Sequence, residues 1–541
     1  MTEFPRKVRR GLTVALALAL CAATVTPAPS ADTASARSAA QLGSVDFANS
    51  CRPAVQTAFQ QAVAMLHSFW YVEAEKTFRD VLAHDPSCGI ATWGIAATLM
   101  SNPLGAIGPS PPAAKRAQAA IEQGRRVGAG TPRERDYLEA VAAYYDDWAN
   151  RPERVRQEAR SRAFEALAAR YPGDDEAQIF HALYLAATQS LADQTYSRYL
   201  KAAEILEQQF VRHPDHPGVA HYLIHSYDAP SIAARGLPAA RRYASIAPAV
   251  PHALHMPSHI FTRVGAWAES AATNERAAAA ARRDNDGGER LHAMDYMMYA
   301  YLQLGRDGEA KRVMEDAALV WGFNTARGAG GYAAAAIPAR YALERGDWPR
   351  AAALEPAAGT PPFVEALTHF ARAVGAARGG DAITAERGAG ELARLRDNLR
   401  AANDRYWATE VEVSRLGAAA WAAWARGRHD EALELMRAAA DTEDASEKHI
   451  VTPGRLLPAR ELLGDMLAES GRPAEARKEF EASHRREPDR FRGLYGAAQA
   501  AARSGDGAAA RRHFARLVEV GGESASRPEL AQARAFLAAN P

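Results

Sequence analysis

A 34-residue spacing of glycine, alanine and phenylalanine constrains this chain more than any other feature of its sequence. Near the C-terminus, Gly471–Ala476 and Phe480 are matched 34 residues later by Gly505–Ala510 and Phe514. A glycine can end a helix in the left-handed conformation. The alanine lets a second helix approach closely, and the aromatic ring fills the space between the two helices. The spacing therefore predicts repeated pairs of antiparallel helices.

The same punctuation recurs along most of the chain. Upstream it is carried by Gly265 with Ser270, Gly305 with Ala310, Gly346 with Ala351 and Gly427 with Ala432, and near the N-terminus by Glu73, Ala74, Phe78 and Pro86. Alanine, leucine, arginine and glutamate are abundant, which favours helix throughout. No sustained alternation of β-branched residues argues for a sheet. We therefore predict an all-α protein.

These residues resemble the tetratricopeptide repeat, and the resemblance covers most of the chain. It implies a right-handed α-solenoid whose first helices line a concave groove. Such arrays bind many kinds of ligand, so the fold alone says little about function. The predicted organisation is a signal peptide over 1–36, N-terminal repeats with a Pro- and Gly-rich loop over 37–130, a central array with the histidine cluster over 131–355, and C-terminal repeats over 356–541. Residues 442–453 are predicted as a polar connection.

Two histidine pairs stand at equivalent places of neighbouring repeats. His221 and His225 are four residues apart, and so are His255 and His259, which follow 34 residues later. His252 lies three residues before His255. Residues three and four apart share one face of a helix. Each pair is therefore expected to point both imidazoles at one spot on the groove.

Further residues fall at the same register or beside it. Counting back from Gly305 places His292, Asp295 and Tyr299 of the next repeat on the same surface. The candidates for groove-lining or for orienting the imidazoles are His67, Trp93, Asp228, Asn274, His292 and Tyr299. For Trp93 the alternative is a place in the core between repeats. His213 and His216 flank Pro214 in a turn and are expected to be solvated.

Neutral imidazole is the commonest ligand for Zn, Cu, Fe and Ni. The predicted metal ligands are His221, His225, His252, His255, His259 and Asp295. An open ligand position would support hydrolytic or redox chemistry, and whether the protein is an enzyme stays open. Two alternatives remain, namely direct binding of an anionic or peptide ligand and a structural hydrogen-bond cluster. Pro257 either makes its flanking histidines diverge or re-aims His252 and His255.

The charge balance limits the classes of partner. Lysine and arginine number 65 against 64 acidic residues, which gives no electrostatic argument for nucleic acid. We expect a small molecule or peptide in the groove. The alternative function is a periplasmic or extracellular scaffold that binds a peptide or acidic partner without metal.

The N-terminus has the pattern of an export signal. Four basic residues precede the short apolar run Leu12–Val25, and small residues follow. We predict an exported protein, periplasmic or secreted, without a stable membrane anchor. Beyond the signal, Cys51 and Cys88 are candidates for one disulfide, with two buried thiols as the alternative. The stretches HSFWY, AHYLIHSYD and HMPSHIF resemble exported bacterial repeat proteins with this histidine pattern.

Overall fold

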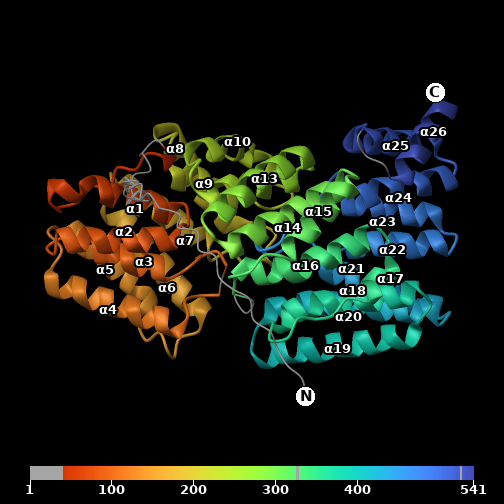
Figure 1. The fold of residues 1–541 in the computed structure, drawn as a ribbon, viewed down its shortest axis with the longest axis horizontal. Helices are drawn as coiled ribbons and strands as arrows, with labels where there is room; N and C mark the ends of the chain where they lie inside the picture. The colour runs from red at the N-terminus through yellow and green to blue at the C-terminus, as the bar shows by residue number, and fades with distance from the viewer. Residues whose placement is uncertain (1–40, 106, 325–327, 524–526, 541) are drawn as a thin grey trace, which may run out of the picture. The chain divides into compact units, whose positions relative to one another are not determined.

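A computed structural model describes residues 41–105, 107–324, 328–523 and 527–540 of the chain. The predicted signal peptide lies outside these residues. All described residues belong to one compact unit, and the predicted boundaries near residues 130 and 355 stay predictions. Figure 1 shows the order of the helices by colour. None of the described helices combines the length and apolar character needed for a membrane span.

The first part of the chain forms nine helices and one short 3-10 turn among the described residues. They are η3 (Pro53–Val55), α1 (Gln56–His67), α2 (Tyr71–His84), α3 (Ala91–Leu99), α4 (Pro111–Val127), α5 (Pro132–Tyr145), α6 (Glu153–Arg170), α7 (Asp175–Ala186), α8 (Ser197–Arg212) and α9 (Pro217–Ser226). Consecutive helices pack against each other, and α1 also contacts α9. The N-terminal helices therefore reach the element that carries the first histidine pair.

The central part carries the remaining histidines of the cluster. Its elements are η4 (Ala233–Gly236), α10 (Leu237–Ile246), α11 (Pro251–His255), α12 (Pro257–Arg263), α13 (Trp267–Arg283), α14 (Gly287–Gln303), α15 (Asp307–Ala317), α16 (Gly328–Glu344) and α17 (Trp348–Ala352). Helix α13 packs against α11, α12 and α14. It therefore supports the three elements that bear histidines in this part.

The last part is the most regular. It comprises α18 (Pro362–Arg378), α19 (Ala382–Ala401), α20 (Arg405–Ala425), α21 (His429–Asp444), α22 (Ala459–Glu469), α23 (Pro473–Arg486), α24 (Phe491–Arg503), α25 (Gly507–Gly521) and α26 (Pro528–Ala539). Helix α24 also contacts α14. The C-terminal repeats thus pack back onto the central ones.

The glycine and alanine punctuation acts as the sequence predicts. Gly305 and Gly471 adopt positive φ values of 66° and 75° after a first helix, a conformation that a side chain disfavours. Phe480 of α23 is buried, and a Cβ atom at Gly464 of α22 would lie 2.8 Å from its ring. Glycine therefore makes room for the aromatic ring between helices. The prediction of an all-α array of helix-turn-helix repeats is confirmed over the described residues, which contain no strand.

The core is a chain of overlapping clusters. One cluster of buried apolar residues covers positions 42 to 261, the next 254 to 341, a third 332 to 500 and a fourth 491 to 533. The sequence ranges of neighbouring clusters overlap. Stability of this kind comes from contacts between adjacent repeats.

The connection between α21 and α22 differs from the prediction of a polar linker. Every residue of 446–458 is buried except the half-buried Ile450 and Arg455. Its polar side chains are paired inside the protein, as Lys448 is with Asp228 and Thr452 with Arg340. Buried polar groups need such partners, and these partners lie far away in the sequence. We call residues 446–458 the inner segment.

A disulfide links the N-terminal repeats. Cys51 precedes η3, Cys88 lies between α2 and α3, and their Cα atoms are 4.7 Å apart. Both residues are buried. The bridge closes a sequence separation of 37 residues, which restricts the unfolded chain.

Candidate metal centre

Six histidines from four helices meet in the protein interior. His221 and His225 come from α9, His252 and His255 from α11, His259 from α12 and His292 from α14. None is more than 7% exposed. They form two groups in which the ligand atoms lie within 4.8 Å of one another. The first triad is His221, His225 and His252, and the second triad is His255, His259 and His292.

Pro257 does not separate the histidines that flank it. Helix α11 ends at His255 and α12 begins at Pro257, but Met256 between them keeps helical angles of φ −53° and ψ −36°. The direction of the helix is thus nearly preserved although the proline lacks an N–H. The Nε2 atoms of His255 and His259 lie 3.2 Å apart. His252, one turn earlier, joins the first triad instead.

The second triad presents lone pairs without hydrogens between them. His255 Nδ1 lies 2.7 Å from Asn274 Oδ1, and the orientation of this amide is fixed because Asn274 Nδ2 donates to the Ser270 carbonyl. His259 Nδ1 lies 2.8 Å from an Asp228 carboxylate oxygen. Both partners only accept, so both Nδ1 atoms carry the hydrogen of a neutral imidazole. The two Nε2 atoms therefore face each other as acceptors.

Two members of the first triad, His221 and His252, are oriented in the same way, whereas His225 Nδ1 has no hydrogen-bond partner among the described residues. His221 Nδ1 donates to the carbonyl of His67 over 2.7 Å, and His252 Nδ1 donates to a Glu289 carboxylate oxygen over 3.1 Å. Their Nε2 atoms are thus left as lone pairs. His252 Nε2 has no hydrogen-bond partner among the described residues, while His225 Nε2 lies 3.1 Å from His221 Nε2. Carbonyl or carboxylate partners on the far nitrogen are typical of metal-binding histidines.

Burial favours the neutral form of five of the six imidazoles. Desolvation, followed by the charges of neighbouring histidines, holds the pKa of His221, His225 and His255 well below the usual range. Burial also lowers the pKa of His292 to about 3, against the opposing effect of Glu289. His259 has a lowered pKa despite its contact with Asp228. A neutral imidazole has the lone pair that a metal requires.

Asp228 connects the second triad to the inner segment. Besides His259, it accepts from Arg263 Nε at 2.8 Å and from Lys448 Nζ at 3.3 Å. Burial opposes its ionisation, but Lys448 and Arg263 outweigh this effect and the pKa of Asp228 falls well below its usual range. Burial lowers the pKa of Lys448 to about 8. Asp228 therefore stays ionised and fixes the His259 ring.

Aromatic rings and the inner segment enclose the cluster. The Tyr296 hydroxyl lies 3.1 Å from the Thr452 carbonyl and 3.4 Å from His259 Nε2, so its single hydrogen has a closer acceptor than the histidine. On the other side, the Phe69 ring centre is 4.4 Å from that of His221. Phe69 is half-buried and has a positive φ of 55°. No local pattern in the sequence indicated the inner segment, because its contacts with Tyr296, Asp228 and Arg340 are long-range.

Several predicted site residues lie apart from the histidines. Asp295 is paired with Arg340, Nε to carboxylate at 3.0 Å, and both are fully buried. Tyr299 donates to Glu487 at 2.7 Å, toward the C-terminal repeats. Trp93 packs against aromatic rings of the N-terminal core, with the Phe47 ring centre 5.1 Å away. The structure does not bring Asp295, Tyr299 or Trp93 into either triad.

Asp228, Asn274 and His67 contact the histidines directly. The first two accept the Nδ1 hydrogens of the second triad, and the carbonyl of His67 accepts that of His221. His292, predicted to line the groove or to orient the imidazoles, is a member of the second triad. Glu289, which orients His252, was missed by the sequence reasoning. Its position three residues before His292, and hence on the same face of α14, was the available signal.

A third cluster of His67, Glu176 and His216 differs chemically from the triads. His216 Nδ1 accepts from the Val219 amide, so its Nε2 donates to Glu176 at 3.0 Å. His67 Nε2 lies 2.9 Å from the other oxygen of Glu176. This carboxylate satisfies both rings without an ion. The expectation that His216 is solvated is wrong, because His216 is 4% exposed and caps α9.

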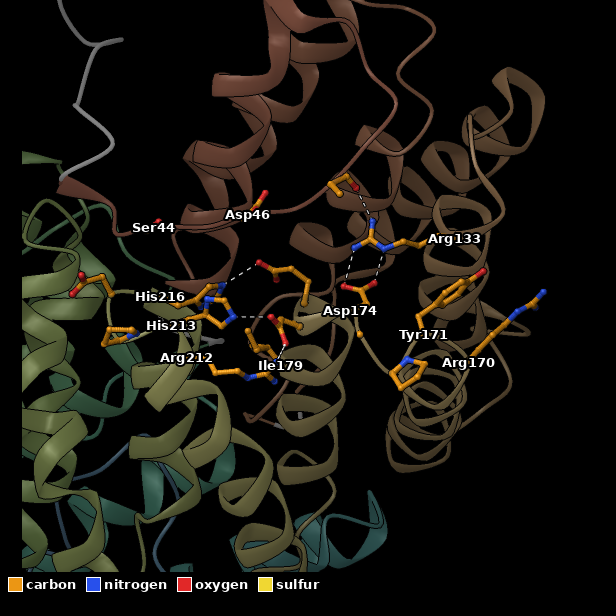
Figure 2. Close-up of a pocket in the computed structure, with 17 residues that line it drawn as sticks. Ser44, Asp46, Arg133, Arg170, Tyr171, Asp174, Ile179, Arg212, His213 and His216 are labelled. Atoms are coloured by element: carbon orange, nitrogen blue, oxygen red, sulfur yellow. Dashed lines mark hydrogen bonds and ion pairs between the residues drawn. The ribbon is translucent and has the colours of Figure 1, made fainter.

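A charged cavity of about 690 Å³ lies beside this third cluster (Figure 2). In it Arg133 faces Asp174, with Nη2 and a carboxylate oxygen 2.9 Å apart, and His213 lies 2.7 Å from Asp175. Figure 2 shows these pairs and the bond from His216 to Glu176 among the residues that line the cavity. Asp174, Asp175 and Glu176 thus already have hydrogen-bond donors among the lining residues. The lone-pair geometry of the two triads has no counterpart here.

Comparisons with known proteins give no family for this chain. No protein-family model matches it, and no curated protein matches its sequence. Among solved structures, the APC/C hetero-tetramer Cut9–Hcn1 is similar at 10% identity over 90% of this chain and 89% of that one, with a TM-score of 0.33. The human IFIT1 dimer with m7Gppp-AAAA matches at 12% identity over 76% of this chain and 87% of that one, with a TM-score of 0.32. Scores this low carry no argument about function.

Proposed function

We propose that this protein is an exported helical-repeat protein that binds transition-metal ions through its two histidine triads. One observation carries the proposal. The Nε2 atoms of His255 and His259 face each other at 3.2 Å while both Nδ1 hydrogens are committed to acceptors. Two lone pairs at this distance repel unless a cation lies between or beside them.

The distance suits a metal ion. Bonds of 2.0–2.1 Å to two imidazoles at a tetrahedral angle place their nitrogens about 3.3 Å apart. A proton shared between the two rings is the other cation to consider. It would make one ring an imidazolium. At His259 burial opposes that charge more strongly than Asp228 favours it, so the pKa of His259 stays below its usual value. The metal is therefore the better-supported occupant.

The donor set limits the identity of the ion. Six imidazoles and no thiolate favour Zn, Cu, Fe or Ni and disfavour Mg and Ca, which prefer oxygen ligands. Three histidines per triad leave a position for a non-protein ligand, as in catalytic zinc sites. A bound ion would supply an acidic water or a redox centre there. Hydrolytic or redox activity is thus compatible with the site.

The disulfide between Cys51 and Cys88 supports the export part of the proposal, because such bridges persist in oxidising compartments. The scaffold hypothesis has less support. The surface around the histidines is covered by the chain's own inner segment, and Tyr296 and Arg340 bind the backbone of that segment. A peptide at the same place would have to displace it.

The test is the metal content of the exported chain, purified without an affinity tag and reconstituted separately with Zn, Cu, Ni and Fe(II). At least one ion per chain is expected, with a sharp loss in His255→Ala and His259→Ala. His181→Ala is the matched control, because His181 is a buried histidine outside both triads. No uptake of any of the four metals would refute the proposal, and so would equal loss in the control.

A further inference from the structure

The two triads are neighbours. The ring centres of His225 and His259, which belong to different triads, are 5.6 Å apart, and those of His252 and His255 are 6.0 Å apart. Histidines of the two triads thus approach each other at two places. Within each triad the ligand atoms gather within 4.8 Å of one another. Two occupied triads would therefore place two ions in one shared interior space.

The positive charge of two metal ions in that space would favour an anionic ligand. Two divalent ions on six neutral imidazoles would bring four positive charges into a buried site. Asp228 is already shared by Arg263 and Lys448, both buried. Glu289 contacts only the edge of the cluster through His252, and its side chain is 33% exposed. Uncompensated buried charge is costly, so the open ligand positions favour anionic over neutral ligands.

The enclosure limits the size of the anion. The Tyr296 ring centre is 4.7 Å from that of His255 in the second triad, and the Phe69 ring centre is 5.6 Å from that of His252 in the first. The inner segment lies behind Tyr296, whose hydroxyl donates to the Thr452 carbonyl. Because these rings lie against the imidazoles, a ligand as large as a peptide or sugar does not fit there, and the anion to consider is one of a few atoms.

We propose that the two triads hold a pair of transition-metal ions that share one small anionic oxygen ligand, of the class of hydroxide or a simple carboxylate. This inference rests on the proposed metal-binding function. Ions that share one oxygen are typically 3.5–4 Å apart in two-metal sites. His225 and His259 would then ligate different ions of one dinuclear centre.

The experiment loads the exported, disulfide-bonded chain with Cu(II) and compares total copper with the copper detected by electron paramagnetic resonance. Two Cu(II) ions that share an oxygen couple magnetically, so we expect two coppers per chain and loss of most of the resonance signal. His292→Gln and His225→Gln each disable one triad. Each variant is expected to bind one copper and to regain the full signal of one isolated ion.

Azide serves as the probe for the anion. One azide per copper pair is expected, with a charge-transfer band that both triad variants lose or weaken. His181→Gln is the control and should behave like the unchanged chain. Two copper ions with full, uncoupled signal, or only one copper per unchanged chain, would overturn the inference while leaving metal binding intact. No copper at all, together with no Zn, Ni or Fe(II), would instead refute the proposed function.

Discussion

Asp295→Asn separates the role of a buried ion pair from that of a metal ligand. Asp295 and Arg340 are both fully buried, with the carboxylate 3.0 Å from Arg340 Nε and 3.3 Å from Nη2. The substitution removes the negative charge and leaves the guanidinium in the interior. The sequence placed Asp295 among the metal ligands, whereas the structure gives its carboxylate to Arg340.

Breaking a buried ion pair by removing one partner costs about 3–5 kcal/mol. Arg340 keeps three other acceptors, namely Thr452 Oγ1 and the carbonyls of Gly454 and Arg455. The loss should therefore lie at the lower end, about 3 kcal/mol in the free energy of unfolding. Since these acceptors belong to the inner segment, that segment should also become more mobile.

The assay combines urea denaturation, amide hydrogen exchange of residues 446–458 and metal analysis. We expect reduced stability, faster exchange in the inner segment and unchanged metal content. Asp146→Asn is the control, because Asp146 is 77% exposed in its pair with Arg151 and should cost less than about 1 kcal/mol. An equally small loss in Asp295→Asn would refute the ion-pair argument. Loss of metal from a folded Asp295→Asn variant would show that Asp295 is a metal ligand after all.

Three further predictions concern stability. Burial raises the pKa of Glu443 to about 7 from 4.5; the folded state therefore keeps the proton longer, and its contribution falls by about 1.4 kcal/mol per pH unit as the pH rises from 4.5 through 7. The difference between the wild type and Glu443→Gln in urea denaturation should show this slope, and a flat difference would contradict it. Replacing Cys51 and Cys88 by serine should cost about 3–4 kcal/mol, and two reactive thiols in the unreduced, denatured wild type would contradict the bridge. Gly464→Ala should cost about 1–3 kcal/mol by overpacking an aromatic ring, whereas Gly390→Ala, with no atom near its added Cβ, should stabilise slightly; equal thermal midpoints would refute the packing argument.

The parts of the site that the sequence predicted correctly follow from the local spacing of residues along a helix. Residues four apart on one helix must share a face, so His221 lies beside His225 and His255 beside His259, as the pattern predicts. The assignment across helices could not be read in this way. The His252 ring centre is 5.1 Å from that of His221 and 6.0 Å from that of His255 on its own helix, and the reason is how neighbouring repeats stack. Such stacking depends on side-chain volumes along the whole interface.

Long-range partners were beyond the sequence for the same reason. Nothing local to Lys448 indicates that its ammonium meets Asp228, which lies 220 residues earlier. Composition predicted a polar connection over 442–453, but Lys448 and Thr452 there are buried and pair with Asp228 and Arg340 from distant parts of the chain. His216 misled in the same manner, because a turn histidine next to a proline is usually exposed and here caps a buried helix.

By itself the sequence determined the repeat, the helices and the existence of histidine pairs, because glycine caps, helical periodicity and the 34-residue translation act through neighbours along the chain. Only the tertiary structure decided that six histidines divide into two triads, that Asn274 and Asp228 fix the rings of His255 and His259, and that Asp295 serves Arg340. Those outcomes depend on which surfaces meet when repeats stack. Two residues that are distant in sequence stabilise the fold only once the repeats that carry them are in contact.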